Sequence, residues 1–316
     1  MPEMLATRKA YGQALVEVGR ENPNVVVLDC DLSKSTNTNM FAKEFPQRFI
    51  NMGIAEANMV ATAAGLAASG KIPFASTFAV FATGRAWEQA RMSVGYTKLN
   101  VKIAATHAGI TVGEDGASHQ ANEDIAIMRA IPNFTIIVPA DGVETRKAVH
   151  AAAKHPGPTY IRLGRADVPI LYDDDYEFRV GKAHVLREGS DVSLFACGGM
   201  VSESLNAAEL LASEGVSAEV VNVSTIKPLD RETVLASVRK TGAAVSAEEH
   251  TIVGGLGGAL AELLCEEYPI PMRRVGLEDC FGESGGSSEL LCKYCMTGAN
   301  IADAAREALK RKEARR

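Results

Sequence analysis

The sequence lacks an excess of positive charge, an apolar leader and any long uncharged hydrophobic run. Its 33 Lys and Arg residues are outnumbered by 39 Asp and Glu residues, which gives a formal net charge of −6 at pH 7. This balance disfavours nucleic acid and anionic membranes as partners. The N-terminus has no apolar h-region, and no later segment is both long and uncharged enough to span a bilayer. We therefore expect a cytoplasmic protein.

Cysteine is scarce as well. Six cysteines in 316 residues, spaced without a disulfide framework, are typical of a reducing compartment. Cys292 and Cys295 form a C-x-x-C pair, but Cys280 is the only other cysteine nearby. Because a structural zinc site normally needs four ligands, we assign no metal to this pair. We expect two half-buried thiols in a helix.

Hydrophobic residues make up 47% of the chain and charged residues 23%, which favours about two packed domains. Apolar runs alternate with segments of helical periodicity. This pattern predicts an α/β fold with a mostly parallel sheet covered by helices on both faces, followed by a smaller α/β domain. We place the first domain at 1–167, the linker at 168–179 and the second domain at 180–316. Strands are predicted at 25–28, 49–52, 72–76, 101–106, 135–138, 159–163, 192–196, 218–223 and 243–246, and helices at 7–20, 142–153, 202–213, 256–267 and 299–312.

Glu56 lies where a short apolar run ends at Gly53 and an Ala- and Gly-rich helix begins. This places its carboxylate in the first helical turn, at a strand-to-helix junction where open α/β sheets bind ligands. The small and apolar neighbours predict a site with little water. Taken alone, the position also suits an ordinary glutamate that the helix dipole stabilises by roughly 0.3–1 kcal/mol.

A glycine-rich loop at 107–120 holds two histidines, His107 and His119, and two carboxylates. Histidine is the side chain best suited to proton transfer near neutral pH. An ordinary polar surface loop is the alternative, and the chain offers no second cluster that would argue for a metal site. The glycine-rich segment 254–258 departs from the G-x-G-x-x-G pattern at Leu260, so we expect tight helix packing there instead of a dinucleotide site.

Several motifs occur in a fixed order along the chain. They are T-R-K at 7–9, D-L-S-K-S at 31–35, G-I-A-E at 53–56, S-T-F-A-V-F at 76–81, T-H-A-G-I-T-V-G-E-D-G-A-S-H-Q at 106–120, P-A-D-G at 139–142 and R-L-G-R at 162–165. In this order they resemble the thiamine-diphosphate enzymes of the transketolase family. The first domain resembles the family's pyrimidine-binding domain, and 180–316 resembles its C-terminal domain.

The resemblance implies a role for each matching residue. Glu56 would hydrogen-bond N1′ of the cofactor's aminopyrimidine and keep that ring in its imino form. Phe78 and Phe81 would form an aromatic wall for this ring, and Asp31 would complete the cofactor-binding set. Gly84 departs from the family, which often has a third aromatic there, and leaves Arg85 or Trp87 as replacements.

The resemblance also implies a substrate site. Asp115 and His107 would bind hydroxyls of the sugar, and His119 would lie close to the reacting hydroxyls, so that both histidines are candidates for catalysis. The terminal phosphate of a sugar phosphate would be bound, with help from His107, by Arg8, Ser35 and Arg165. The function implied is transfer of a two-carbon ketol unit from a ketose phosphate to an aldose phosphate.

One family motif is missing. The G-D-G motif that holds the diphosphate and Mg²⁺ in transketolases does not occur in this sequence. The resemblance therefore implies the C-terminal half of a split transketolase, with a partner subunit that binds the diphosphate and Mg²⁺ in an α2β2 assembly. Two alternatives stay open, a decarboxylating enzyme similar to deoxyxylulose-phosphate synthase or to the β subunit of a 2-oxo-acid dehydrogenase, and a non-catalytic regulatory subunit. The presence of both His107 and His119 favours ketol transfer.

Overall fold

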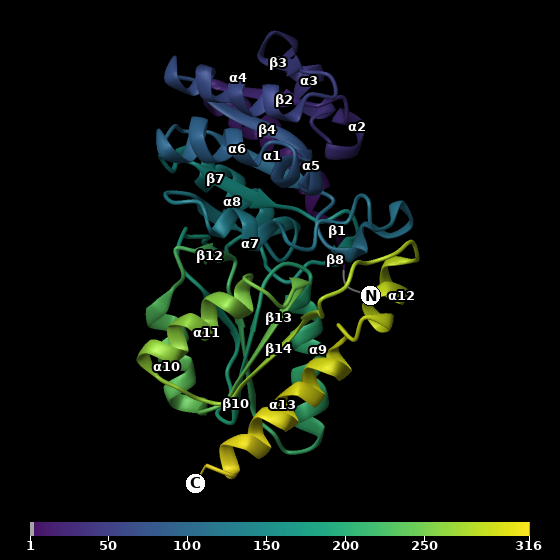
Figure 1. Cartoon of the computed structure of the whole chain (residues 1–316), viewed down its shortest axis with the longest axis vertical. Helices are drawn as coiled ribbons and strands as arrows, with labels where there is room; N and C mark the ends of the chain where they lie inside the picture. The colour runs from purple at the N-terminus through teal and green to yellow at the C-terminus, as the bar shows by residue number, and fades with distance from the viewer. Residues whose placement is uncertain (1–2, 316) are drawn as a thin grey trace.

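The computed structural model describes residues 3–315. Two α/β domains follow each other along the chain, and they lie one above the other in Figure 1 with the C-terminus at the far end of the second. The described helices include none that is long and apolar enough to cross a membrane. The predicted fold class, a mostly parallel sheet with helices followed by a smaller α/β domain, is confirmed.

The first domain is built on a seven-stranded sheet with the order β12-β6-β7-β5-β4-β2-β3. Its strands from this part of the chain are β2 (Val25–Asp29), β3 (Phe49–Asn51), β4 (Ile72–Phe78), β5 (Lys102–Thr106), β6 (Thr135–Ile137) and β7 (Thr159–Arg162). Its helices are α1 (Thr7–Glu21), α2 (Ser33–Thr36), α3 (Asn39–Glu44), α4 (Glu56–Ala68), α5 (Ala79–Gly84), α6 (Trp87–Gln89), α7 (Asp124–Arg129) and α8 (Gly142–Lys154), with shorter 3₁₀ or π segments η1 (Pro46–Arg48), η2 (Ala90–Tyr96) and η3 (Ile110–Asp115).

Strand β2 shows why helices cover both faces of this sheet. All of its residues are buried, and side chains alternate between the two faces of a strand. Val25 and Val27 pack into the core with α1, α3 and α8, whereas Val26 and Leu28 pack into the core with α4 and α7. A continuous apolar run with both faces buried is typical of a parallel strand.

The second domain has a five-stranded sheet with the order β14-β13-β10-β11-β9, in which only β9 is antiparallel. Its strands are β9 (His184–Arg187), β10 (Val192–Ala196), β11 (Ala218–Asn222), β13 (Ala244–Thr251) and β14 (Met272–Leu277). Its helices are α9 (Met200–Ser213), α10 (Arg231–Thr241), α11 (Leu256–Glu267), α12 (Ser287–Lys293) and α13 (Gly298–Glu313).

The two domains share structure that the sequence did not predict. Strand β12 (Thr225–Lys227) belongs to the second half of the chain but pairs antiparallel with β6, so it forms an edge of the first sheet (Figure 1). Strand β8 (Asp167–Pro169) pairs with β1 (Met4–Ala6), within a segment whose composition indicated a linker. One hydrophobic core runs from Val26 of the first sheet to Val221 of the second. The second domain is therefore joined to the first through the main chain and through the core.

Two local predictions had different outcomes. The expectation of half-buried thiols is wrong, because Cys292 and Cys295 are both exposed. Helix α12 ends at Lys293, so the second thiol of the pair lies beyond it. Tight packing of the 254–258 glycines is confirmed, since a Cβ on Gly255 would lie 2.1 Å from a carboxylate oxygen of Glu248.

Candidate active site

The carboxyl ends of the parallel strands carry most of the residues that the sequence singled out. Glu56 follows β3, Phe78 ends β4, His107 follows β5 and Arg165 follows β7. Ligands of open α/β sheets bind outside these strand ends. The fold thus assembles a candidate site at one edge of the first sheet from segments far apart in sequence.

Glu56 is a buried carboxylate with one charged partner. It is the first residue of α4 and is 4% exposed. Its Oε1 accepts a hydrogen bond of 3.1 Å from Nη1 of Arg85, whose side chain is 53% exposed. The turn into α4 needs Gly53, because φ there is +68°, a backbone conformation that favours glycine. The carboxylate is therefore buried and paired with a half-exposed arginine.

A stack of flat rings lies along one side of the site. The rings of Phe78 and Phe81 stack with centroids 5.8 Å apart and an angle of 12° between their planes. The His107 ring stacks on Phe78 at 3.7 Å, and the His119 ring meets Phe81 edge-on at 5.6 Å. The guanidinium carbon of Arg85 lies 4.1 Å from the Phe81 centroid. The site therefore joins a flat aromatic surface to two imidazoles and a cation.

His107 is held in the neutral state. Its side chain is 3% exposed, and burial lowers its pKa to about 3, with a further lowering from the nearby cations Arg8 and Arg165 and from His119. Its Nδ1 lies 2.9 Å from Oγ1 of Thr106. A neutral imidazole at physiological pH can donate one hydrogen bond and accept another.

The three residues that the resemblance assigns to a terminal phosphate lie together. Arg8 donates from Nη1 to the main-chain oxygen of Ser35 at 2.9 Å and from Nε to that of Arg165 at 3.3 Å. Burial and the neighbouring Arg165 lower the pKa of Arg8. Arg165 also pairs with Glu114 at 2.8 Å, whose side chain is 75% exposed. Two guanidinium groups beside a serine make a fitting site for an anion.

A buried aspartate fixes the loop that carries Asp31 and Ser35. Asp29, at the end of β2, accepts hydrogen bonds from the main-chain N–H of Leu32 at 2.7 Å and from the hydroxyls of Thr36 and Thr38 at 2.7 and 2.9 Å. Burial raises the pKa of this carboxyl group. Asp29 was not singled out from the sequence, although its place at a strand end was a signal.

Three residues lie less favourably than expected. Asp115, in the glycine-rich loop, is exposed. Asp31 is also exposed, and its contact is with the Asn51 side chain at 3.2 Å. Trp87 does not replace the missing aromatic, because its ring packs against the core and its Nε1 donates to the Ile127 oxygen at 3.3 Å. Arg85 is the residue that covers Phe81.

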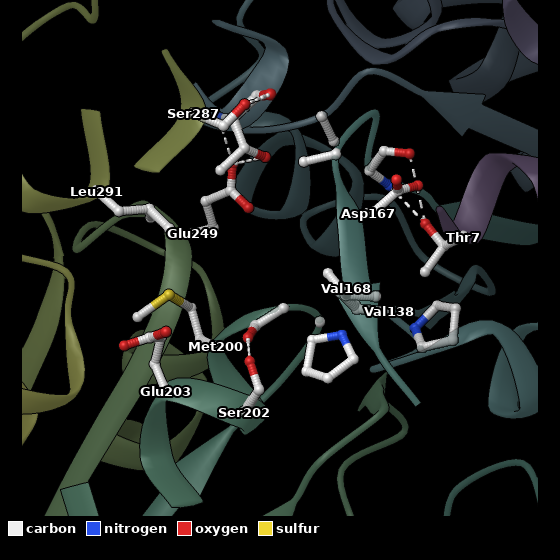
Figure 2. A pocket seen from close by; sticks show the side chains of 18 of the residues that line it. Thr7, Val138, Asp167, Val168, Met200, Ser202, Glu203, Glu249, Ser287 and Leu291 are labelled. Atoms are coloured by element: carbon white, nitrogen blue, oxygen red, sulfur yellow. Dashed lines mark hydrogen bonds between the residues drawn. The ribbon is translucent and has the colours of Figure 1, made fainter. Parts of the chain in front are cut away.

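The second domain holds the glycine-rich loop by contacts that the sequence did not reveal. Glu249 Oε1 accepts from the main-chain N–H of Thr111 at 2.7 Å and from its hydroxyl at 2.8 Å. Ser287 donates from its hydroxyl to the Thr111 oxygen at 2.9 Å. Figure 2 shows Glu249 and Ser287 close together at one side of an interdomain cavity of about 230 Å³. Neither Glu56 nor the phenylalanine pair lines this cavity, but Thr7, Ala108 and Gly164, which adjoin Arg8, His107 and Arg165 in sequence, do line it.

A buried ion pair contacts the chain directly after the same loop. Arg162 is 6% exposed and donates from Nε to both oxygens of Asp124, at 2.8 and 3.1 Å. Its Nη2 reaches the main-chain oxygens of Ala121 and Glu249 at 3.3 and 2.8 Å. Tyr160 donates to the same aspartate at 2.7 Å. The network ties β7, α7 and the second domain together.

Comparison with known proteins decides the family. Residues 3–170 match the family model described as the transketolase pyrimidine binding domain, and residues 181–301 match the transketolase C-terminal domain. This chain belongs to the transketolase family. The family depends on thiamine diphosphate.

Three relatives of the transketolase family are similar over nearly the whole chain. A putative transketolase C-terminal section of Methanocaldococcus jannaschii is 51% identical, with 96% of each chain covered. The 6-deoxy-6-sulfo-D-fructose transketolase subunit SqwH of Clostridium sp. is 46% identical, covering 98% of this chain and 96% of the relative. A solved structure of a split-gene transketolase, described as an inactive β4 tetramer, has a TM-score of 0.92 at 56% identity, with 98% of this chain and 99% of that chain covered.

The residues present fit the pyrimidine end of thiamine diphosphate. A flat ring needs an aromatic face, which Phe78 and Phe81 provide. A ring nitrogen needs a proton partner in a dry site, which Glu56 provides. Within residues 3–315, no group of three or more His, Cys, Asp or Glu side chains is placed to hold a metal ion.

Proposed function

We propose that this chain is the C-terminal subunit of a split transketolase, which transfers a two-carbon ketol unit from a ketose phosphate to an aldose phosphate. The observation that carries the proposal is the buried Glu56 carboxylate beside the stacked rings of Phe78 and Phe81. A buried acid and an aromatic face at strand ends suit a bound heterocycle better than a surface role.

Each residue has a part in this proposal. Glu56 holds and shares a proton at N1′ of the aminopyrimidine, and burial excludes water from that proton. Thiamine diphosphate, when bound, supplies the carbon centre that carries the two-carbon unit between sugars. His107 is neutral and so serves as a hydrogen-bond partner for sugar hydroxyls. His119, which is partly exposed and edge-on to Phe81, is the candidate for moving a proton at the reacting hydroxyls.

The arginine pair selects an anionic sugar end. Arg8 and Arg165 lie beside Ser35 and would bind the terminal phosphate, with Asp115 reaching a hydroxyl of the sugar from the loop. Binding a phosphate there requires Arg165 to exchange its exposed partner Glu114 for the substrate. A tetrahedral sulfonate would meet the same donors, which is relevant because the name of the Clostridium relative specifies a sulfo sugar.

A partner subunit would hold the diphosphate and Mg²⁺. The similar split-gene structure consists of β chains alone and is described as inactive. In this chain the surface beside the site is open, because Ile54, two residues before Glu56, is 77% exposed. The outward positions Asn58, Ala61 and Gly65 of α4 are also exposed and mostly small, which suits close packing by another chain. These observations support an α2β2 assembly with the cofactor between chains.

Glu56→Gln in the assembled complex tests the proposal. The assay mixes this chain with the diphosphate-binding subunit, thiamine diphosphate and Mg²⁺, and follows ketol transfer between a ketose phosphate and an aldose phosphate. We expect activity to fall about hundredfold or more, because the amide cannot exchange a proton with N1′. Glu44→Gln is the matched control, since Glu44 is also paired with an arginine but is exposed, at the end of α3. Activity of Glu56→Gln near that of the wild type would refute the proposed role.

The same complex separates the remaining alternatives. Pyruvate is supplied in place of the ketose phosphate, and carbon dioxide release is measured. Release at a rate that matches or exceeds ketol transfer would identify a decarboxylating enzyme. A non-catalytic role predicts that Glu56→Gln, Phe78→Ala and His119→Ala all leave the activity of the complex unchanged.

A further inference from the structure

Arg85 makes both of the contacts that the proposed function gives to the cofactor's aminopyrimidine. Its planar guanidinium lies over the face of Phe81, 4.1 Å from the ring centroid. The same group donates to Oε1 of Glu56 at 3.1 Å. The guanidinium is thus a flat group with an N–H donor and an electron-poor face, and it already contacts both the Glu56 carboxylate and the aromatic wall.

The Arg85 guanidinium and the cofactor's aminopyrimidine cannot make these contacts at the same time. One face of Phe81 accommodates one flat group at van der Waals distance, and a carboxylate oxygen facing a ring nitrogen cannot keep the same geometry toward a guanidinium. We propose that Arg85 is an internal stand-in for the aminopyrimidine, which closes the site in the cofactor-free chain and must swing out when thiamine diphosphate binds. This inference rests on the proposed function and adds a competitor for the cofactor.

The surroundings of Arg85 allow this movement. The residue lies between α5, which ends at Gly84, and α6, which begins at Trp87. Its side chain is 53% exposed, so water can solvate the guanidinium once it leaves. A Cβ added at Gly84 would meet no atom within 4 Å, so the neighbouring space is open. A third aromatic at position 84 would add bulk to this space.

Arg85 also stabilises the buried Glu56 carboxylate in the cofactor-free chain. Glu56 is 4% exposed, and a buried carboxylate without a partner is costly. Arg85 supplies a charged donor until the cofactor arrives, and its partial exposure keeps the pair weak enough to exchange. An ion pair with one half-exposed partner and a cation–π contact are each modest interactions, and together they correspond to about a three- to tenfold effect on binding.

The test is the affinity of the assembled complex for thiamine diphosphate, measured by isothermal titration calorimetry with Mg²⁺ present. We expect Arg85→Ala to lower the Kd about three- to tenfold, because the competitor is gone. Arg85→Lys, which keeps the charge but loses the flat face, should fall between Arg85→Ala and the wild type. Arg91→Ala is the matched control, since Arg91 is an exposed arginine in the same region whose contact is with Met92, and it should leave the Kd unchanged.

A double-mutant comparison shows whether the gain acts through Glu56. In a Glu56→Gln background the ion pair is absent, so Arg85→Ala should improve the affinity less than in the wild type. An equal or higher Kd for Arg85→Ala than for the wild type would overturn the inference and would make Arg85 a binding residue. Failure of the proposed function looks different, because the wild-type complex would then not bind thiamine diphosphate or would catalyse no ketol transfer.

Discussion

Glu249 connects the second domain to the glycine-rich loop, and its replacement tests whether that connection sets the geometry of the loop. Its Oε1 accepts from the main-chain N–H and the hydroxyl of Thr111 at 2.7 and 2.8 Å. The same oxygen would lie 2.1 Å from a Cβ on Gly109, so it fills the space beside that glycine. Glu249→Ala removes the acceptor of two hydrogen bonds and the group packed against the loop.

The expected magnitude follows from the burial of Thr111, which is 7% exposed. A buried main-chain N–H left without an acceptor costs about 1–3 kcal/mol. The hydroxyl can rotate to another acceptor, so we count only the N–H and the lost packing, and expect Glu249→Ala to lower the free energy of unfolding by about 2–3 kcal/mol. Glu249→Gln keeps an acceptor of the same shape and should change it by less than about 1 kcal/mol.

Burial raises the pKa of the Glu249 carboxyl, which gives the Glu249→Gln comparison a pH dependence. As pH rises above the ordinary glutamate pKa, the unfolded chain ionises first while the folded chain stays protonated. The free energy of unfolding of the wild type, relative to Glu249→Gln, should therefore fall as pH rises through this window and level off above the raised folded pKa.

Three measurements check the prediction. Urea unfolding gives the free energies, amide hydrogen exchange reports opening at Thr111, and steady-state kinetics of the complex give KM. We expect Glu249→Ala to speed exchange at Thr111 and to raise the KM for the sugar phosphate, because the loop carries His107, Asp115 and His119. The Kd for thiamine diphosphate should stay within about twofold, since the second domain contacts neither Glu56 nor Phe81 in the described hydrogen bonds and ring contacts.

Glu248→Ala is the matched control. This neighbouring carboxylate is 1% exposed and accepts from the N–H groups of Leu256 and Gly257 at 2.7 and 2.8 Å, at the start of α11. Its loss should destabilise the chain without changing exchange at Thr111. If Glu249→Ala and Glu248→Ala had the same effects on exchange and KM, or if Thr111 exchange were unchanged in both, the proposed connection would be refuted.

Three further predictions follow from single groups. Burial lowers the pKa of His107 to about 3. The unfolding free energy of the wild type, relative to His107→Asn, should therefore rise by up to about 1.4 kcal/mol per pH unit as pH rises toward 6.5. A difference between the two proteins that is the same at pH 5 and pH 6 in urea unfolding would contradict this. Asp124→Asn leaves the buried Arg162 guanidinium without its counter-charge and should cost about 3–5 kcal/mol in urea unfolding, so that a loss below 1 kcal/mol would contradict the buried pair. Gly84→Ala meets no atom within 4 Å at the end of a helix and should be stabilising by up to about 1 kcal/mol, and a clear loss of thermal stability would show that the position is crowded.

Much of the fold could be predicted because its central strands are continuous apolar runs. The runs at 25–28 and 192–196 became β2 and β10 with bounds within one residue. Strand β12 could not be found in this way. Three residues, Thr225 to Lys227, give no usable periodicity, and this strand is specified by its pairing with β6 across about 90 residues of sequence.

The candidate site shows the same limit. Residues that follow a strand closely, such as Glu56 and His107, could be placed from the local pattern because parallel strands end at one edge. Their assigned roles came from the resemblance. The contact between Thr111 and Glu249 joins residues 138 positions apart, and no local feature of E-E-H at 248–250 signals it. Arg85 was named only as a replacement for an aromatic, and its pairing with Glu56 depends on how α4 and α5 meet.

The two halves of the candidate site are supported by different parts of the chain. Glu56, Phe78 and Phe81 are held by β3, β4 and the helices that follow them, all within the first domain. The glycine-rich loop is held by Glu249 and Ser287, which belong to the second domain. Because the supports differ, substitutions in the second domain should change how the sugar is bound and leave the cofactor's aminopyrimidine largely unaffected, whereas substitutions near Arg85 should do the reverse. The division of labour between the domains is therefore measurable as a separation of KM for the sugar from Kd for thiamine diphosphate.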